Sequence, residues 1–360
     1  MADAKILTEL DDDNRDGHCF GFFHRKSRNQ SLLLERPMKD KELEHGKHEN
    51  IEFAFGSMQG YRLSNEDMHK HLLEFDNQFW KLWSYFSIFD GHNGIDAAKH
   101  ACDRLDKQLL TSLNHLLTKH DNSSYDSSES INFDIEEFKS AIKETYYKLD
   151  EELRSVIQDQ SGSACITCLI GPEQIYLVNI GDSRALLVSK DGHILRTTKD
   201  HKPDDEEELK RIEDAGGKVQ RNTGDVPRVE NLLAITRVLG DFILSKEIVP
   251  PMADIIEYPR SSDEERVEFI VLACDGVFDV MTNEDVGQFI IKHLKQKSSN
   301  LKKLCVQLLD ECLKRNSTDN MSVYIIRLND NNEYEEAYSP LKHHHHLFHH
   351  HHHLKDQHHD

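Results

Sequence analysis

Four short apolar runs follow one another between residues 163 and 198, with only two or three residues between neighbouring runs. The runs read SACITCLI, QIYLVNI, RALLVSK and HILRTT, and they are separated by GPE, GDS and DG. A parallel return between two strands needs a crossover of about a dozen residues. Connections as short as these therefore force each strand to run antiparallel to the one before it. The sequence predicts an antiparallel meander in the middle of the chain.

Strands and helices around this meander do not alternate strictly. Apolar runs bounded by polar turns predict further strands at 51–58, 84–91, 267–275 and 321–328. Apolar positions at helical spacing predict helices at 94–110, 133–157, 204–215, 283–297 and 300–314. Because the helices are not interleaved one by one with the strands, this order indicates an α+β layered domain rather than a doubly wound parallel sheet.

Three polar segments lie outside this pattern. Residues 1–50 are polar and mostly aperiodic, so we expect a flexible N-terminal extension. Residues 121–130 have the composition of a mobile surface insert. Residues 329–360 are acidic and then rich in histidine, and we interpret them as a solvated tail, in part an affinity tag, rather than as a site of metal capture. The folded domain is predicted to span residues 51–328.

The charge of the chain argues against two classes of function. The net charge is −21, and residues 51–328 carry 33 basic against 48 acidic side chains. An acidic body of this kind repels nucleic-acid backbones and anionic lipid surfaces. No run approaches the ~18 consecutive apolar residues of a membrane-spanning helix, and the N-terminus has no apolar core of the signal-peptide type. We expect a cytoplasmic protein, with a nuclear location also open, that binds neither nucleic acid nor membrane.

The cysteines point to a reducing compartment. Their number, seven, is odd, and they are scattered from Cys19 to Cys312, which does not suit a disulfide framework. Cys165 and Cys168 form a CxxC pair, but residues three apart on a strand point to opposite faces. We interpret both as buried small hydrophobic residues rather than as a zinc pair or a redox motif.

Several acidic residues stand next to the end of an apolar run. Asp90 follows FSIF, Asp275 follows IVLAC, and Asp319 comes just before the last predicted strand, while Glu66 and Asp67 follow the first. An acid in such a place lies just beyond the apolar residues of the strand but is still held by rigid backbone, which suits a site of fixed geometry. Carboxylate oxygens are the ligands that Mg²⁺ and Mn²⁺ prefer.

Arg62, four residues before Glu66, is the planar bidentate donor that a phosphate oxygen needs. From spacing alone, however, surface ion pairs around turns are the simpler explanation of these residues. No cluster of closely spaced Cys and His within residues 51–328 offers a softer site for zinc.

Nine short motifs follow one another between residues 60 and 320. In order they are GYRLSNED (60–67), FSIFDGH (86–92), DQSGSA (159–164), GDSRA (181–185), DHKP (200–203), RIEDAGGKV (211–219), RVLGD (237–241), ACDGVFDVM (273–281) and DN (319–320). Each motif alone is weak, but their common order is not plausibly accidental. Through them the chain resembles the metal-dependent protein phosphatases known as the PP2C or PPM family.

The resemblance implies the fold of that family, a four-layer α/β/β/α sandwich of two mainly antiparallel sheets flanked by helices. The metal site would lie at one edge between the sheets, with a flap-like segment at 201–239 near it. Asp182, Ser183 and Arg184 of GDSRA are expected to hold a turn rather than to contact substrate.

The resemblance also implies a centre of two Mg²⁺ or Mn²⁺ ions. Asp90 would bridge the ions, with the Gly91 carbonyl on one of them and Asp275 and Asp319 on the other. Two further acids would act directly or through waters, and these are Glu66 and Asp67.

Four more residues take roles by the same resemblance. Asp159 matches an acid that the family uses for a third, weaker ion, and Asp241 is a further candidate ligand. Arg62 would hold the substrate phosphate, and His92 would protonate the leaving oxygen.

The predicted function is therefore hydrolysis of phosphoserine and phosphothreonine esters in phosphorylated proteins, by attack of a water that bridges two metal ions. We expect a monomer. No cysteine lies in a CxxxxxR loop, so a covalent cysteine route has no support. Two alternatives stay open: a pseudophosphatase that keeps the fold as a regulatory binding module, and a metal-buffering protein that acts through its histidine-rich tail. The presence of all the matched acids favours the active enzyme.

Overall fold

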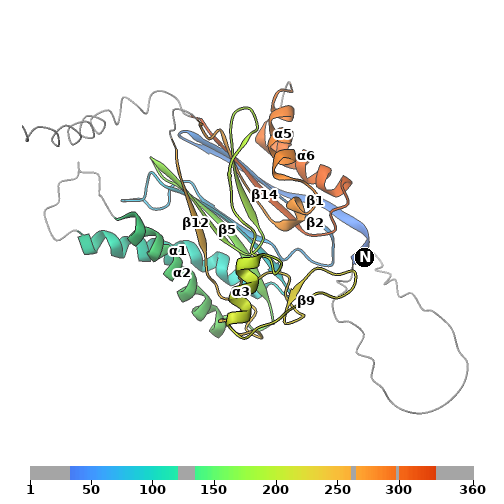
Figure 1. The fold of residues 1–360 in the computed structure, drawn as a ribbon. Coiled ribbons are helices and arrows are strands. Elements are labelled where there is room, and N and C mark those ends of the chain that lie inside the picture. Colours follow the sequence, from blue (N-terminus) through green and yellow to red (C-terminus); the bar gives the residue numbers. More distant parts are fainter. Residues whose placement is uncertain (1–32, 121–133, 261–264, 297–299, 330–360) are drawn as a thin grey trace, which may run out of the picture.

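Two antiparallel sheets form the centre of the molecule (Figure 1). The structure is a computed structural model that describes residues 33–120, 134–260, 265–296 and 300–329. The predicted surface insert at 121–130 lies outside the described residues, as do the tail from residue 330 onward and residues 1–32. Within the described part, no helix is both long and apolar enough to cross a membrane.

Each sheet has six strands, and every strand pairing within the two sheets is antiparallel. The first sheet contains, in spatial order, β1 (Leu33–His48), β2 (Ile51–Arg62), β14 (Met321–Leu328), β13 (Phe269–Ala273), β7 (Arg184–Val188) and β8 (Ile194–Thr197). The second contains β12 (Asp254–Pro259), β6 (Gln174–Ile180), β5 (Gly162–Ile170), β4 (Ser84–His92) and β3 (Met68–Leu72), and β11 (Leu239–Gly240) pairs with β5.

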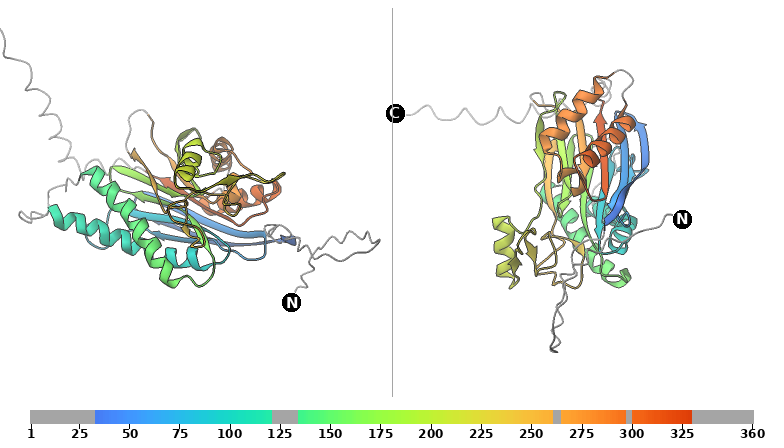
Figure 2. Two further views of the ribbon diagram at one scale, coloured as in Figure 1. Left: turned by 60° about the horizontal axis from the view of Figure 1, so that its bottom comes forward. Right: turned by 90° about the vertical axis from the view of Figure 1, so that its right-hand side faces the viewer.

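Helices cover the outer face of each sheet (Figure 2). The second sheet is covered by α1 (Asp96–His120) and α2 (Ile135–Val156), and the first by α5 (Asn283–Leu294) and α6 (Leu301–Lys314). A single short turn of helix, α4 (Asp275–Phe278), follows β13. The predicted four-layer α/β/β/α sandwich is confirmed.

Strand alternation divides the core into layers. On β4, Phe86 and Ile88 face the other sheet, whereas Tyr85 and Phe89 face α1 and α2. Cys165 and Cys168 on β5 divide in the same way, and both are fully buried. The predicted orientation of this CxxC pair is therefore confirmed. Burying an apolar side chain of Phe or Ile size stabilises the fold by about 1.5–3 kcal/mol, so these layers hold the scaffold rigid.

The predicted meander is wrong in one respect: the chain changes sheets in its middle. β5 and β6 pair in the second sheet, but β7 and β8 pair in the first. The connection Gly181–Ser183 therefore crosses from one sheet to the other instead of closing a hairpin. Gly181 has φ +91°, a conformation that favours glycine, and an added Cβ would lie 2.6 Å from that of Ala164. A short linker constrains strand direction, but it does not by itself require the strands to pair.

The prediction of a flexible extension over residues 1–50 is wrong for residues 33–48, which form β1, a sixteen-residue edge strand paired with β2. Its side chains are mostly exposed or half-buried, so its sequence lacks apolar alternation. Charged residues are common on edge strands, where they oppose pairing with another chain. The polar composition reflects this edge position.

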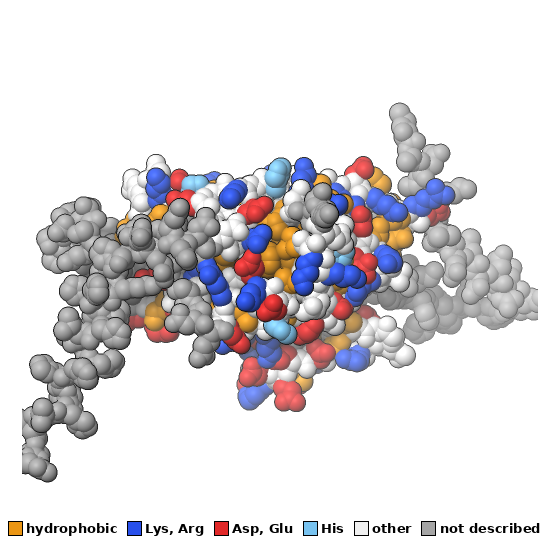
Figure 3. Space-filling view, turned by 90° about the horizontal axis from the view of Figure 1, so that it is seen from above, with side chains coloured by type: hydrophobic (Ala, Val, Ile, Leu, Met, Phe, Trp, Pro, Cys, Tyr) orange, Lys and Arg blue, Asp and Glu red, His pale blue; other side chains and the backbone are white. Residues whose placement is uncertain are grey.

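The predicted flap-like segment forms a small unit of its own at one end of the sandwich. It contains α3 (Glu206–Asp214) and the short hairpin of β9 (Val219–Gln220) and β10 (Arg228–Val229). Asp205 caps α3 by accepting hydrogen bonds from the backbone of Glu207 and Glu208, both at 3.2 Å. On the face of the molecule in Figure 3, basic and acidic side chains are interspersed, so no extended surface of one charge covers it.

Candidate metal centre

The antiparallel topology collects the predicted acids at one end of the sandwich. Asp90 lies near the end of β4, and Asp67 immediately precedes β3, the antiparallel neighbour of β4. In the other sheet, Asp275 follows β13 and Asp319 precedes β14, its antiparallel neighbour. Because an antiparallel partner begins where a strand ends, residues far apart in the sequence meet here.

Asp90 belongs to two sets of possible metal ligands. The ligand atoms of Asp90, Asp182 and Asp275 all lie within 4.8 Å of one another. The ligand atoms of Asp67, Asp90 and Cys274 also lie within 4.8 Å of one another. Asp90 is thus the one carboxylate that both sets share among the described residues, which is the position required of a ligand to two cations.

The electrostatics of these acids fit bound cations. Burial raises the pKa of Asp67 to about 7. Burial and then the neighbouring charges of Asp275 and Asp67 raise the pKa of Asp90 well above its usual value, and burial with Asp182 and Asp319 does the same for Asp275. Oδ2 of Asp67 accepts a hydrogen bond from Ser322 at 2.7 Å, but its buried Oδ1 has no partner in the structure. A buried carboxylate oxygen without a donor is expensive unless a cation binds it.

Asn320 fixes the loop that carries Glu66 and Asp67. Its side-chain amide donates to the carbonyls of Gln59 (2.8 Å) and Ser64 (2.9 Å), and its oxygen accepts from the backbone N–H of Glu66 at 3.0 Å. The carbonyl of Glu66 packs against Gly91, where an added Cβ would lie 2.4 Å away. Glycine is therefore needed at this position by the close approach of backbone.

Arg62, at the end of β2, reaches the same acids. Its Nη2 donates to Oδ2 of Asp319. Burial opposes the charge of Arg62, but Asp319, Asp275 and Asp90 together raise its pKa. The guanidinium side chain stays 37% exposed, so it can meet a ligand arriving from solvent.

The family model for Protein phosphatase 2C matches residues 51–321. The chain belongs to the PP2C family. It is 33% identical to Protein phosphatase 1A of Bos taurus over 307 residues, which are 82% of this chain and 75% of the relative. It is 32% identical to Protein phosphatase 1B of Homo sapiens over 308 residues, and there it spans 82% of its own length but only 60% of the relative. The predicted enzyme class, a protein phosphatase, is confirmed at the level of the family.

Solved structures agree with the PP2C fold. A sex-determining protein of C. elegans superimposes with a TM-score of 0.65 at 25% identity, covering 79% of this chain and 66% of that one. A serine-threonine phosphatase 2C of Toxoplasma gondii gives a TM-score of 0.65 at 21% identity, covering 79% of this chain and 99% of that one. The second likeness concerns the fold alone.

In this PP2C chain, His92 and Asp241 form a pair beside the acids. His92 Nε2 lies 2.6 Å from Oδ2 of Asp241. Burial lowers the pKa of His92, but the charge and hydrogen bond of Asp241 outweigh it and raise the pKa overall. Gly162 leaves room for the pair, because an added Cβ would lie 2.2 Å from Asp241 Oδ2. Asp241, predicted as a further metal ligand, contacts the imidazole of His92.

Asp159 lies in a loop near the start of α1. Its Oδ1 accepts from the backbone N–H of Ser161 at 3.0 Å, and its Oδ2 accepts from that of Asp96 at 3.3 Å. Neither Asp159 nor Asp241 belongs to the described sets of close ligand atoms. Their roles as metal ligands stay predictions, as do those of Glu66, Gly91 and Asp319.

Sequence reasoning missed two acids of this site. Asp182, interpreted as a turn residue, lies on the crossing between the sheets and so reaches Asp90 and Asp275. Asp279 comes one helical turn after Asp275, and burial together with Asp182 and Asp319 raises its pKa, against the effect of Lys202. The spacing of four residues within ACDGVFDVM was the available signal, because such residues share a helix face.

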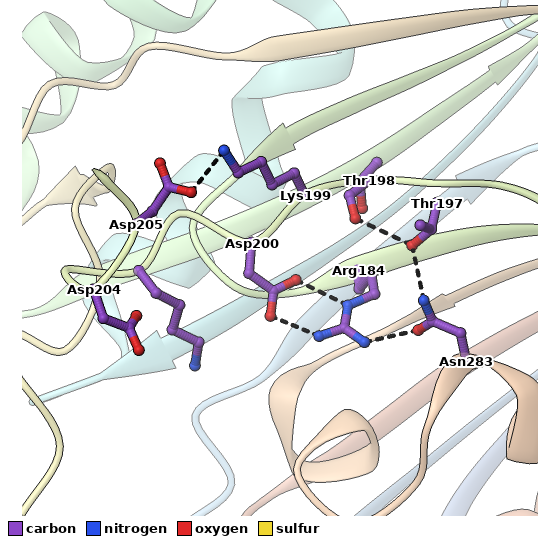
Figure 4. A pocket seen from close by; sticks show the side chains of 9 residues that line it. Arg184, Thr197, Thr198, Lys199, Asp200, Asp204, Asp205 and Asn283 are labelled. Carbon is purple, nitrogen blue, oxygen red and sulfur yellow. Dashed lines mark hydrogen bonds and ion pairs between the residues drawn. The ribbon is translucent and has the colours of Figure 1, made fainter. Parts of the chain in front are cut away.

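An open pocket of about 470 Å³ lies next to the centre (Figure 4). Its charged side chains are largely paired: Arg184 donates to both oxygens of Asp200 at 2.9 and 2.7 Å, and its Nη1 donates to Asn283 at 2.7 Å. Lys202, also on the wall, lies 2.7 Å from Oδ2 of Asp182 and so links the pocket to the acids. The predicted structural role of Arg184 agrees with these contacts.

Proposed function

We propose that this chain hydrolyses phosphoserine and phosphothreonine esters of proteins with two Mg²⁺ or Mn²⁺ ions. The observation that carries the proposal is that Asp90 belongs both to the set with Asp67 and to the set with Asp182 and Asp275. Asp67 and Asp182 are buried and Asp90 and Asp275 half-buried. Carboxylates held this close repel one another, and divalent cations are the natural counter-charge. The fit of the acids to hard cations, together with membership of the family, supports metal-dependent hydrolysis.

The ions would be held by carboxylates from both sheets. Asp90 would contribute to both ion sites, Asp67 to one, and Asp275 with Asp182 to the other. When bound, two such ions lower the pKa of a water and neutralise charge on phosphoryl oxygens. Lys202, held by Asp182, would add positive charge at the side that faces the pocket.

Arg62 and His92 would act on the phosphate ester itself. The exposed part of the Arg62 guanidinium would bind phosphoryl oxygens, while its contact with Asp319 fixes its direction. Asp241 would hold a proton on Nε2 of His92 and favour the charged ring. A charged ring also carries a proton on Nδ1, and this proton is available to the leaving serine or threonine oxygen.

The test is hydrolysis of p-nitrophenyl phosphate and of a phosphothreonine peptide, with Mn²⁺ or Mg²⁺ and then with EDTA. We expect activity that requires the ions and that Asp275→Asn abolishes. Activity that survives chelation or this substitution would refute the metal-dependent proposal. A folded protein that is inactive with every ion, yet binds phosphopeptides, would instead support the pseudophosphatase alternative.

A further inference from the structure

A second group of possible metal ligands lies at a different edge of the sandwich. β1 is the edge strand of the first sheet, as the right-hand view of Figure 2 shows in blue, and β3 is the edge strand of the second. Glu42 and Glu44 lie two apart on β1, and His69 and His71 lie two apart on β3. Residues two apart share one face of a strand, so each strand offers a pair of ligands.

Three of these side chains converge, and His71 joins them through Glu44. The ligand atoms of Glu42, Glu44 and His69 all lie within 4.8 Å of one another. His69 Nε2 and His71 Nδ1 are each 3.4 Å from Oε2 of Glu44. Ligand bonds of about 2.0–2.2 Å in tetrahedral geometry place neighbouring ligand atoms about 3.4 Å apart. The spacing around Glu44 is therefore that of ligands around a tetrahedral cation.

Aromatic packing holds both imidazoles in place. The ring of His69 stacks on Phe55 with centroids 3.6 Å apart, and the ring of His71 lies 4.3 Å from that of Phe53. Tyr324 OH lies 3.2 Å from His71 Nδ1. Such preorganisation is what a ligand set needs and what a loose surface ion pair lacks.

We infer that Glu42, Glu44 and His69, with His71 as the fourth ligand, form a site for a first-row transition cation of the Zn²⁺ class. Mixed imidazole and carboxylate ligands favour Zn²⁺ over Mg²⁺, which prefers oxygen ligands and water. The site is thus chemically different from the environment of Asp90, which consists mainly of carboxylates.

The bound cation would tie β1 to β3. β3 directly follows Asp67, and β1 begins opposite Arg62 in the β1–β2 register. The strand that supplies Glu42 and Glu44 lies before residue 51, where the match to the PP2C family model begins. The inferred site is therefore built in part from a segment that lies outside the family match.

The test measures Zn²⁺ affinity by competition with a chromophoric chelator, in excess Mg²⁺ to occupy the carboxylate centre. The full chain is used with the eleven histidines between 343 and 360 replaced by serine, because imidazoles of the tail would bind the probe. E42Q/E44Q is compared with E35Q/D40N, which changes the same charge at two exposed positions of β1. We expect one tight Zn²⁺ per chain that E42Q/E44Q weakens by at least about 100-fold and the control leaves unchanged.

Equal affinity of E42Q/E44Q and E35Q/D40N for Zn²⁺ would overturn the inference. So would loss of the tight Zn²⁺ in Asp275→Asn, because the ion would then occupy the carboxylate centre. Circular dichroism checks that each variant folds, and for the variants of β1 Mg²⁺-supported activity is a second check. If the double variant does not fold, Glu42→Gln alone replaces it, because this substitution changes an exposed side chain. It should lower the affinity for Zn²⁺ by at least about tenfold.

Discussion

The acids of the metal centre and the buried carboxylate of Glu208 differ in their counter-charges. At the metal centre, burial and like charges raise the pKa values of Asp67, Asp90 and Asp275. Within the flap-like segment, burial would also raise the pKa of Glu208, but hydrogen bonds from Arg237, Thr236 and Arg211 bring it down to about 2. The chain pairs Glu208 with its own guanidinium groups, whereas the acids of the metal centre are left largely to an external cation.

The contacts explain the difference. Glu208 accepts from Arg237 Nε at 3.0 Å, from Arg211 Nη2 at 2.9 Å and from Thr236 Oγ1 at 2.6 Å. At the metal centre, Lys202 and Arg62 reach only Asp182 and Asp319. A buried carboxylate with its donors satisfied is structural, whereas buried carboxylates lacking them are a functional-site signal.

The comparison is tested most strongly at Asp90. Asp90→Asn should lower kcat/KM by roughly a thousandfold, since a ligand shared by two ions contributes several kcal/mol to the transition state. In EDTA the same variant should melt at a higher temperature than the unchanged protein, because it removes a buried like charge. Steady-state kinetics and calorimetry measure the two effects. Asp103→Asn, at an exposed position of α1, is the control and should alter neither.

Glu208→Gln should lower stability and leave activity largely unchanged, the opposite of Asp90→Asn. It removes the carboxylate that pairs with Arg237 and Arg211, although Arg237 keeps its contact with Asp254 at 2.8 Å. Breaking a buried ion pair costs about 3–5 kcal/mol of unfolding free energy. Activity per folded molecule should change little, because Glu208 does not belong to the described sets of metal ligands. Urea unfolding measures the loss, with exposed Glu206→Gln on the same helix as control. A stable but inactive Glu208→Gln would contradict the division between structural and functional acids.

The sequence predicted much of the fold and the central acids because both depend on local pattern. Apolar runs located the strands, and the acids beside their ends, Asp67, Asp90 and Asp275, are the ones that the structure brings together. Asp182 was not predicted as a ligand because its position depends on the crossing from one sheet to the other, and linker length does not reveal that crossing. β1 escaped because an exposed edge strand has no apolar period to detect.

The pairing of His92 with Asp241 is a smaller and more specific test. Asp241 has φ +48°, a conformation that asparagine also tolerates, so Asp241→Asn should preserve the backbone. It removes the charge that raises the pKa of His92, and one pKa unit corresponds to about 1.4 kcal/mol, or tenfold. We expect activity near neutral pH to fall by about tenfold and the alkaline limb of the pH–rate profile to move to lower pH. An unchanged limb would show that Asp241 does not control the protonation of His92.

The smallest expected effect is a loss of stability at low pH that depends on Glu208. The folded pKa of Glu208, about 2, lies below its ordinary value of 4.5, so its ionised form stabilises the fold above pH 4.5. That stabilisation should be lost progressively as the pH falls from 4.5 toward 2, because the folded carboxylate must then take up a proton. Urea midpoints at pH 5 and pH 3 should fall further apart in the unchanged protein than in Glu208→Gln. Both proteins share the metal-centre acids, whose raised pKa values act in the opposite direction, so the difference between them isolates Glu208. Equal shifts in the two proteins would mean that the donors around Glu208 do not hold it ionised.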